Sequence, residues 1–463
     1  MVFSSITFLY FFLPVVLLIY FISPKKLKNI ILLVSGLFFY AWGEPVYVLI
    51  MLFSSFVDYI AGLAIDKYDD DPKKRTIALL ASLIVNLGLL GVFKYSGFFL
   101  GIFGIEMTPL ALPIGISFYT FQSMSYTIDM YMRKIKVQKS FLSFATYVSL
   151  FPQIVAGPIV RYEDVQNEID SRTVNIGKIG EGAGIFARGL AKKVLLANNI
   201  GMLWSEIKVM DYSEISTVTA WLGILAFTFQ IYYDFSGYSD MAIGLGKMLG
   251  FNFPENFDHP YISKSVSEFW RRWHMTLGSW FKSYVYIPLG GNRGGKLKTL
   301  RNLFIVWALT GLWHGASWNF VLWGVYFGVL IILEKLFLGK VLEKLPGFIT
   351  IPYTFFIVVL GWVLFDTADL TAAFDYFAAM FGQTDSIIDN TAYWQLKSNA
   401  IMFGLCILGS GQLMKKFGEK IQEGFIGSKI YENVMPVIQV GLILICTAFL
   451  VDASYNPFLY FRF

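Results

Sequence analysis

The chain has 463 residues, of which 56% are hydrophobic and only 15% are charged. This composition excludes an ordinary soluble enzyme, because a water-soluble surface carries many more charges. The net charge of +5 is explained by lysines and arginines in short loops, so it requires no nucleic-acid partner. The 2 cysteines, Cys406 and Cys446, lie in apolar segments without a CxxC spacing, which predicts buried packing rather than a disulfide or a metal site.

Apolar segments of membrane-spanning length recur along the chain, since a spanning helix needs ~20 predominantly apolar residues. We therefore predict an all-α polytopic membrane protein. The first segment has no basic residue before it and is followed by Lys25 and Lys26, so we expect it to remain as a helix with its N-terminus outside. The predicted spans lie near residues 6–22, 30–43, 46–64, 77–93, 111–130, 183–203, 216–233, 318–337, 350–366, 397–411 and 433–452.

The basic loops predict the orientation of these spans, because lysine and arginine are retained on the cytoplasmic side. After the first span, basic residues gather near 67–75, 133–139, 161–178 and 415–420. If the last of these loops is cytoplasmic, the helix near 433–452 runs outward. Both termini are then expected to be extracytoplasmic, which requires an even number of crossings.

Four segments rich in glycine, proline or small polar residues interrupt the apolar pattern and are expected to break helices. Non-helical backbone at membrane depth is tolerated only where it lines a cavity or is buried in protein. The breaks therefore predict a tunnel or cavity within a single domain that covers residues 1–463. They are PIGIS at 113–117, FPQIVAGPIVR at 151–161, DFSGYSD at 234–240 and GGNRGGK at 290–296.

The segment SEFWRRWHMTLGSWFK at 267–282 combines tryptophans, basic residues and a histidine. Its large apolar side chains lie broadly on one face at helical spacing, while Arg271 and Arg272 fall elsewhere. A basic, tryptophan-rich helix is typical of one that lies in the membrane interface. A cofactor-binding site carries equal weight as an interpretation.

The chain has only 3 histidines, and each suggests a different role. His314 ends an apolar stretch between Trp313 and Gly315, and an ionisable side chain at membrane depth is costly. We therefore predict that His314 is catalytic, as the general base for a hydroxyl nucleophile. His274 positions the substrate or His314, or else anchors an interfacial helix. His259 lies in a polar loop and is expected to be solvated.

The glycine-rich segment GGNRGGK has the spacing of a nucleotide-binding loop, but Leu297 stands where serine or threonine is needed, and no βα unit surrounds it. An ATPase is therefore excluded. Exposed backbone N–H groups, together with Arg293 and Lys296, still suit the phosphates of another ligand. For Asp234 and Asp240, acid–base catalysis, cation binding and structural hydrogen bonding all remain open.

The chain ends with the aromatic and basic sequence NPFLYFRF. This segment is either an aromatic belt with a basic anchor or a tail that folds back into a cavity. In the second case Tyr460 presents a phenol to the site. A phenyl ester keeps much of the transfer potential of a thioester, because phenol has a pKa of ~10 and phenolate leaves readily. Tyr460 is therefore a candidate relay for an acyl group.

These motifs together resemble the membrane-bound O-acyltransferases, in particular the bacterial branch that includes the membrane proteins of alginate and peptidoglycan O-acetylation. The resemblance runs from end to end, and the pair RRWH at 271–274 and GLWHGA at 311–316 is highly specific. Other matching stretches are MVFSS at 1–5, LPIGISFYTFQSMSYTID at 112–129, FPQIVAGPIVR at 151–161, YYDFSGYSDMAIGLGKMLGFNFPENFDHPYIS at 232–263 and the terminal FLYFRF.

The resemblance implies a ring of about 11–12 transmembrane helices, with tilted, interfacial and re-entrant helices, around a central tunnel. The catalytic motifs then occupy residues 110–330, and the C-terminal helices with their tail occupy 395–463. It implies that His314 is catalytic and that His274 belongs to the same site. The implied acyl donor is cytosolic acetyl-CoA, a substrate rather than a tightly bound cofactor. Its phosphates are expected near Arg271, Arg272, Arg293 or Lys296.

The resemblance also implies a location in the bacterial cell membrane and an extracytoplasmic partner of the SGNH-hydrolase type, which completes the acetylation of a polysaccharide or cell-wall glycan. A related branch transfers D-alanine to teichoic acid, but it usually lacks the extra C-terminal helices, so acetyl transfer is favoured. The alternatives from other classes are a transporter and a non-catalytic scaffold. A transporter needs charged pairs along its path and often has repeated halves.

Overall fold

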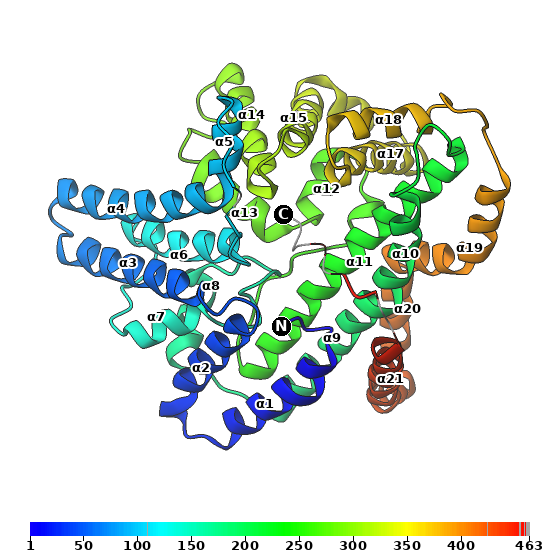
Figure 1. Ribbon diagram of the computed structural model, residues 1–463. Coiled ribbons are helices and arrows are strands. Elements are labelled where there is room, and N and C mark those ends of the chain that lie inside the picture. The colour runs from blue at the N-terminus through cyan, green and yellow to red at the C-terminus, as the bar shows by residue number, and fades with distance from the viewer. Residues whose placement is uncertain (109, 424, 453–454, 458, 460–463) are drawn as a thin grey trace. The chain divides into compact units, whose positions relative to one another are not determined.

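The computed structural model describes residues 1–108, 110–423, 425–452, 455–457 and 459. Within these residues all regular secondary structure is helical (Figure 1). Their one extended pairing is an isolated antiparallel bridge between Phe257 and Trp273. The all-α prediction is confirmed.

Five helical segments in the described part of the chain are long and apolar enough to cross a membrane, and each coincides with a predicted span. A shorter apolar helix, Phe8–Ile22, lies at the first predicted span. Large apolar side chains on the five segments are exposed, such as Ile84 at 70% and Val437 at 71%. Such a surface suits lipid rather than water. The five segments are Val48–Lys67, Pro72–Ile102, Trp318–Leu342, Gly347–Asp366 and Glu432–Asp452.

Residues 1–186 and 238–255 form one compact unit. Its helices are α1 (Leu13–Ile22), α2 (Lys28–Ala41), α3 (Val48–Lys67), α4 (Pro72–Leu90), α5 (Ser96–Ile102), α6 (Ile116–Tyr131), α7 (Phe141–Val148), α8 (Tyr162–Asp170) and the first part of α9 (Ile176–Ala191). Helix α6 is buried along nearly its whole length and packs beside α3 and α4 (Figure 1). Asn86 of α4 donates a hydrogen bond of 2.7 Å to the buried carboxylate of Asp58 on α3, which offsets the cost of burying both groups.

Residues 187–237 and 256–463 form a second compact unit. Its helices are α10 (Asn198–Ile207), most of α11 (Thr217–Leu249), α12 (Val266–Arg272), α13 (Met275–Phe281), α14 (Lys296–His314), α15 (Trp318–Leu333), α16 (Gly339–Leu342), α17 (Gly347–Asp366), α18 (Leu370–Met380), α19 (Asn390–Ser410), α20 (Leu413–Gln422) and α21 (Phe425–Asp452). Its core is rich in large aromatic side chains, including the buried Trp323, Phe327 and Trp362. The single domain over 1–463 stays a prediction.

Three of the four predicted helix breaks are irregular in the structure. Gly115, with a φ of 73°, takes a left-handed conformation immediately before α6. Residues 151–161 form buried turns and coil, and residues 290–295 form turns that lead into α14. The predicted helix breaks are confirmed at these three segments.

The predicted break at 234–240 is wrong, because these residues lie inside the continuous helix α11. Gly237 serves close packing instead of a turn. A Cβ atom at Gly237 would lie 2.7 Å from the carbonyl oxygen of Gly189 on α9 and 3.1 Å from the backbone nitrogen of Lys193. Only glycine allows two helices to approach this closely.

The prediction of one helix over 267–282 is also wrong, because α12 ends and α13 begins around Trp273 and His274. His274 has a φ of 46° and a ψ of 52°, a left-handed conformation that is uncommon for a residue with a side chain. The neighbouring loop holds this conformation. Phe257 bridges Trp273, and the Met275 N–H donates to the Asn256 carbonyl at 3.0 Å.

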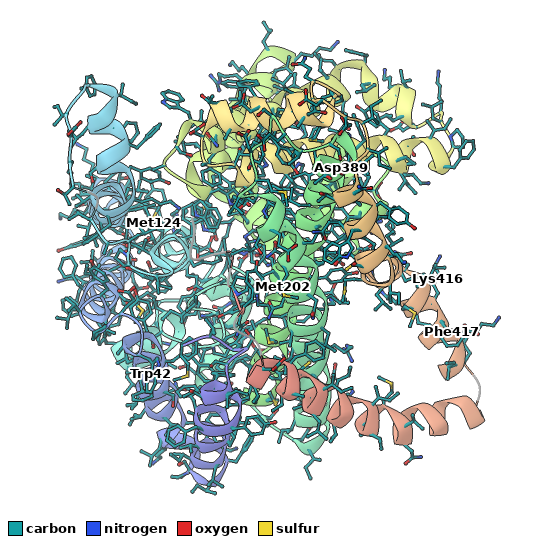
Figure 2. The ribbon with its side chains drawn as sticks, turned by 45° about the vertical axis from the view of Figure 1, so that its right-hand side comes forward. Trp42, Met124, Met202, Asp389, Lys416 and Phe417 are labelled. Carbon is teal, nitrogen blue, oxygen red and sulfur yellow. The ribbon has the colours of Figure 1, made fainter. Side chains whose placement is uncertain are left out.

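The C-terminal part contains the predicted basic segment near 415–420, which forms the helix α20 rather than a loop, and the predicted tail. Lys416 and Phe417 project from α20, where the phenylalanine is 64% exposed (Figure 2). After α21, the described residues 455–457 and 459 fold against α11, where Figure 1 shows the short red end of the chain. Tyr460 lies outside the described residues. Cys406 and Cys446 are free and buried, as predicted.

Candidate active site

His314 is the last residue of α14, and close packing of α14 against α15 fixes its position. A Cβ atom at Gly311 on α14 would lie 2.3 Å from the carbonyl oxygen of Phe320. A Cβ atom at Gly324 on α15 would lie 2.4 Å from the carbonyl oxygen of Trp307. These distances admit only glycine, so the two glycines let the helices meet where the histidine emerges.

Aromatic rings surround the His314 imidazole, and the residue is only 6% exposed. The centroid of its ring lies 5.0 Å from the Trp323 ring, 5.0 Å from the Trp313 ring and 5.3 Å from the Phe365 ring, each at a steep angle. These rings restrict the orientation of the imidazole and make its surroundings largely apolar.

The tautomer of His274 follows from its hydrogen bond with Asn256. His274 Nδ1 lies 3.1 Å from Asn256 Oδ1. The same oxygen accepts from the backbone N–H of Thr276 at 3.3 Å and from its hydroxyl at 2.9 Å. A backbone N–H can only donate, so this Asn256 atom is the acceptor oxygen and His274 Nδ1 carries the proton. In the neutral ring, Nε2 is therefore the proton acceptor.

Burial keeps His274 neutral at physiological pH. Only 2% of the residue is exposed, and desolvation of the charged ring lowers the pKa of His274 to about 3. The ring packs edge-on against Phe235 at a centroid distance of 4.7 Å and lies 5.9 Å from the Trp313 ring. His274 therefore presents a fixed, uncharged imidazole rather than a cation.

The two histidines line the same cavity, which has a volume of about 360 Å³. Trp270 and Leu277 of the tryptophan-rich segment contribute apolar wall together with Trp307 of α14. The cavity matches the kind of site in which an apolar lining surrounds a few placed polar groups. The structure thus places His314 and His274 in one cavity, as expected, while their catalytic roles stay predictions.

Polar side chains that sequence reasoning did not single out also line this cavity: Lys282, Tyr286, Asn292 and Lys335. Lys335 Nζ donates to Asn292 Oδ1 at 2.9 Å, and the Tyr286 hydroxyl donates to the same oxygen. Lys282 and Tyr286 lie in one short π-helical turn, and Lys335 lies in another. Turns of this kind often occur at functional sites.

The four basic residues predicted to bind phosphates lie in different settings. Arg272 is held by acidic groups, with Nη1 2.9 Å from Asp258 Oδ2 and Nη2 3.0 Å from Glu268 Oε1. Arg271 is exposed and lines a second cavity of about 510 Å³. Leu303 and Lys335 line both cavities, so the two adjoin. Arg293 and Lys296 are exposed near the start of α14 and line neither cavity. A phosphate-binding role for these residues stays a prediction.

Of the two aspartates left open by the sequence, Asp234 is buried in an ion pair, with Oδ1 2.5 Å from Lys193 Nζ. A lysine inside a predicted span was the signal that could have revealed this pair, because such a charge needs a partner. Asp240 is half-buried on the same helix.

His259 was expected to be solvated, and this prediction is wrong. The residue is half-buried rather than fully solvated. Burial lowers the pKa of His259. Among the residues that line the histidine cavity, His259 does not occur.

A family model described as the membrane-bound O-acyltransferase family matches residues 133–343, which include both cavity histidines. The probable alginate O-acetylase AlgI of Pseudomonas putida is 37% identical to this chain over 488 aligned positions, which cover 100% of each chain. The chain belongs to the membrane-bound O-acyltransferase family. It is therefore an acyltransferase, and its apolar helices make it the integral membrane protein that its composition predicts.

Two further relatives carry different names. The peptidoglycan O-acetyltransferase of Helicobacter pylori is 31% identical, with 100% of this chain and 98% of that protein aligned. The teichoic acid D-alanyltransferase of Bacillus subtilis is 29% identical, but the alignment covers only 54% of this chain and 68% of that protein. In these comparisons, the relatives that align over the whole chain are named for O-acetylation, whereas the D-alanyltransferase aligns over only part of it.

Proposed function

We propose that this acyltransferase moves an acetyl group from cytosolic acetyl-CoA to an extracytoplasmic partner for the O-acetylation of a polysaccharide or cell-wall glycan. The observation that carries the proposal is that His274 and His314 line one apolar cavity together with Lys282 and Lys335. The reacting end of an acyl thioester is uncharged and suits the apolar wall, whereas its phosphates suit lysine side chains. The relatives that align over the whole chain support acetyl as the transferred group.

In the proposed reaction, a hydroxyl oxygen attacks the thioester carbonyl carbon while His314 takes the hydroxyl proton. The new C–O bond forms, the C–S bond breaks, and the proton passes from His314 to the departing thiolate. His274 Nε2, neutral and aimed by the Asn256 contact at Nδ1, accepts a hydrogen bond that orients the reacting groups. Both histidines begin and end the reaction uncharged.

Tyr460 is the proposed hydroxyl nucleophile. The described tail residues support this role, because the backbone N–H of Leu459 donates to Asp234 Oδ2 at 3.1 Å, and the adjacent Phe235 contacts His274. Tyr460 follows Leu459 directly in the sequence. The acetyl-tyrosine would then pass its acetyl group to the partner, since a phenyl ester is a competent acyl donor.

The proposed setting is the bacterial cell membrane with both chain termini extracytoplasmic, as the basic loops favour. The proposed partner is a protein of the SGNH-hydrolase type that completes transfer to the glycan. Transfer of D-alanine is the second candidate, because a teichoic acid D-alanyltransferase aligns with part of the chain. Its smaller coverage makes it the weaker proposal.

The test uses purified protein in nanodiscs with radiolabelled acetyl-CoA, and the label retained on the protein after denaturation is measured. Wild type is compared with His314→Ala and Tyr460→Phe. His259→Asn is the matched histidine control, because His259 lies outside the cavity and asparagine tolerates the left-handed backbone found there. We expect label on wild type and on His259→Asn, and none on the other two variants.

Other outcomes separate the alternatives. Label that persists in Tyr460→Phe would exclude the tyrosine relay and require another acylated residue. No label on wild type, with coenzyme A released only when a partner is added, would indicate direct transfer to the partner. Labelling by D-alanine from its carrier but not by acetyl-CoA would replace acetyl by D-alanyl transfer. Unimpaired function of His314→Ala in cells would favour a scaffold or a transporter.

A further inference from the structure

Lys193 and Asp234 form a buried ion pair that the proposed chemistry does not use. Lys193 lies in the π-helical turn Lys192–Ala197 between α9 and α10, and Asp234 lies on α11. Their side chains are only 2% and 3% exposed, and Nζ lies 2.5 Å from Oδ1. Two charges this deeply buried need good geometry and further hydrogen bonds to offset their desolvation.

Those further hydrogen bonds come from the C-terminal tail. Lys193 Nζ donates to the carbonyl oxygen of Pro457, and Asp234 Oδ2 accepts from the backbone N–H of Leu459 at 3.1 Å. The pair thus presents a cation to one tail carbonyl and a carboxylate to a tail N–H two residues later. The contacts involve tail backbone, so they fix where the tail runs whichever side chains it carries.

Side chains around the pair hold the preceding tail residues. Asn198 Nδ2 donates to Asn456 Oδ1 at 3.1 Å. The Tyr455 hydroxyl lies 3.2 Å from both Gln230 Nε2 and the carbonyl oxygen of Gly201. These polar contacts with α10 and α11 form a dock for the described tail, with the ion pair at its end nearest Tyr460 in the sequence.

The dock adjoins the histidine cavity through one residue. Phe235, directly after Asp234 on α11, packs its ring edge-on against His274 at a centroid distance of 4.7 Å. His274 lines the cavity. A displacement of this turn of α11 therefore changes the contacts of both the tail backbone and the His274 ring.

We propose that Lys193 and Asp234 are positioning residues, which hold the C-terminal tail beside the histidine cavity so that the tail can take part in acyl transfer. The proposal rests on the proposed function, in which the tail supplies the acyl-accepting hydroxyl. Neither residue contacts the acyl group in this role. Loss of the pair should slow formation of the acyl-protein and leave binding of acetyl-CoA unchanged.

The main variant is the double substitution Lys193→Met with Asp234→Asn. Removing both charges avoids the uncompensated buried charge that either single substitution leaves, so the double variant is expected to fold. Lys193→Arg retains the charge and is the rescue variant. The matched control is Lys134→Met with Asp129→Asn, because Lys134 Nζ lies 3.2 Å from Oδ1 of the buried Asp129 in an ion pair whose residues line neither cavity.

Two readouts are combined for each variant. The first readout uses Pro457→Cys in every variant, which leaves in place the backbone carbonyl that Lys193 contacts. Because the native cysteines are both buried, the rate of alkylation by maleimide reports release of the tail. The second readout is the rate of protein labelling by radiolabelled acetyl-CoA at a series of concentrations. It separates the half-saturating concentration of acetyl-CoA, KM, from the maximal labelling rate constant, kcat. We expect the double variant to show at least tenfold faster alkylation and tenfold lower kcat, with KM within twofold of wild type. Lys193→Arg and the control pair should retain at least half of the wild-type kcat.

Each other outcome would overturn a specific part of the proposal. Alkylation at the wild-type rate in the double variant would show that the pair does not dock the tail. Faster alkylation with unchanged kcat would show that docking does not serve transfer. Normal labelling of Tyr460→Phe, or no labelling of wild type, would overturn the tyrosine relay on which this proposal rests, and the alkylation rates would still decide whether the ion pair holds the tail.

Discussion

Replacing Asn256 by aspartate should introduce a pH dependence that the wild-type site lacks. In the wild type, burial lowers the pKa of His274 to about 3, so the ring stays neutral from pH 8 to pH 5 and Nε2 can accept a hydrogen bond. The Asn256→Asp carboxylate would face Nδ1, which lies 3.1 Å from the present amide oxygen. A negative charge there favours the protonated ring and raises the pKa of His274.

The size of the effect follows from the attraction between the carboxylate and the protonated ring, whose charge centres lie slightly farther apart than the two hydrogen-bonded atoms. Opposite unit charges about 4 Å apart attract by about 4 kcal/mol at an effective dielectric constant of about 20. This energy corresponds to roughly a thousandfold increase in proton affinity at His274. Protonation then blocks Nε2 as an acceptor. We expect the labelling rate of Asn256→Asp to fall as the pH decreases from 8 to 5, over a range in which wild-type His274 does not titrate.

The assay is the initial rate of protein labelling by radiolabelled acetyl-CoA between pH 5 and pH 8, normalised to folded protein. Asn256→Ala is the uncharged control. It removes the acceptor from the N–H groups of His274 and Thr276 and should cost about 1–3 kcal/mol of stability for each bond lost, without a new acidic limb. A pH profile of Asn256→Asp that matches the wild type would refute the argument that a neutral His274 is required.

Three further substitutions test the packing and charge assignments, with one matched control. Gly311→Ala places a Cβ atom 2.3 Å from a carbonyl oxygen, so it should cost about 1–3 kcal/mol of stability by overpacking and lower the thermal midpoint in detergent. The control Gly404→Ala, with nothing within 4 Å, should leave the midpoint unchanged or raise it. Lys335→Met should raise the KM for acetyl-CoA several-fold with little change in kcat, because Lys335 lines both adjoining cavities; an unchanged KM would remove it from the donor path. Arg272→Gln should lower the thermal midpoint and keep KM within twofold, since Arg272 is held by two carboxylates, whereas a large rise in KM would support its predicted phosphate role.

The sequence alone determined the features that depend on local composition. Apolar segments long enough to cross a membrane form helices in lipid, so composition and length were enough to place the five described helices that could span it. Glycine and proline mark breaks through their own backbone preferences, as at Gly115 and in the turns at 290–295. The cost of an imidazole at membrane depth singled out His314, which the structure places in a cavity lined by aromatic residues.

The tertiary structure decided the features that depend on distant residues. From local sequence, Gly237 predicts a helix break. In the structure it lies inside the continuous helix α11, where the missing side chain allows close packing against α9. The left-handed conformation of His274 depends on a bridge and hydrogen bonds from the loop at 256–258, which no local pattern reveals. Lys335 reaches the histidine cavity from a separate helix, and Lys193 meets Asp234 from a different helical segment. Periodicity describes which face of a helix is apolar, whereas these contacts depend on which helices become neighbours, and that is settled only when the chain packs.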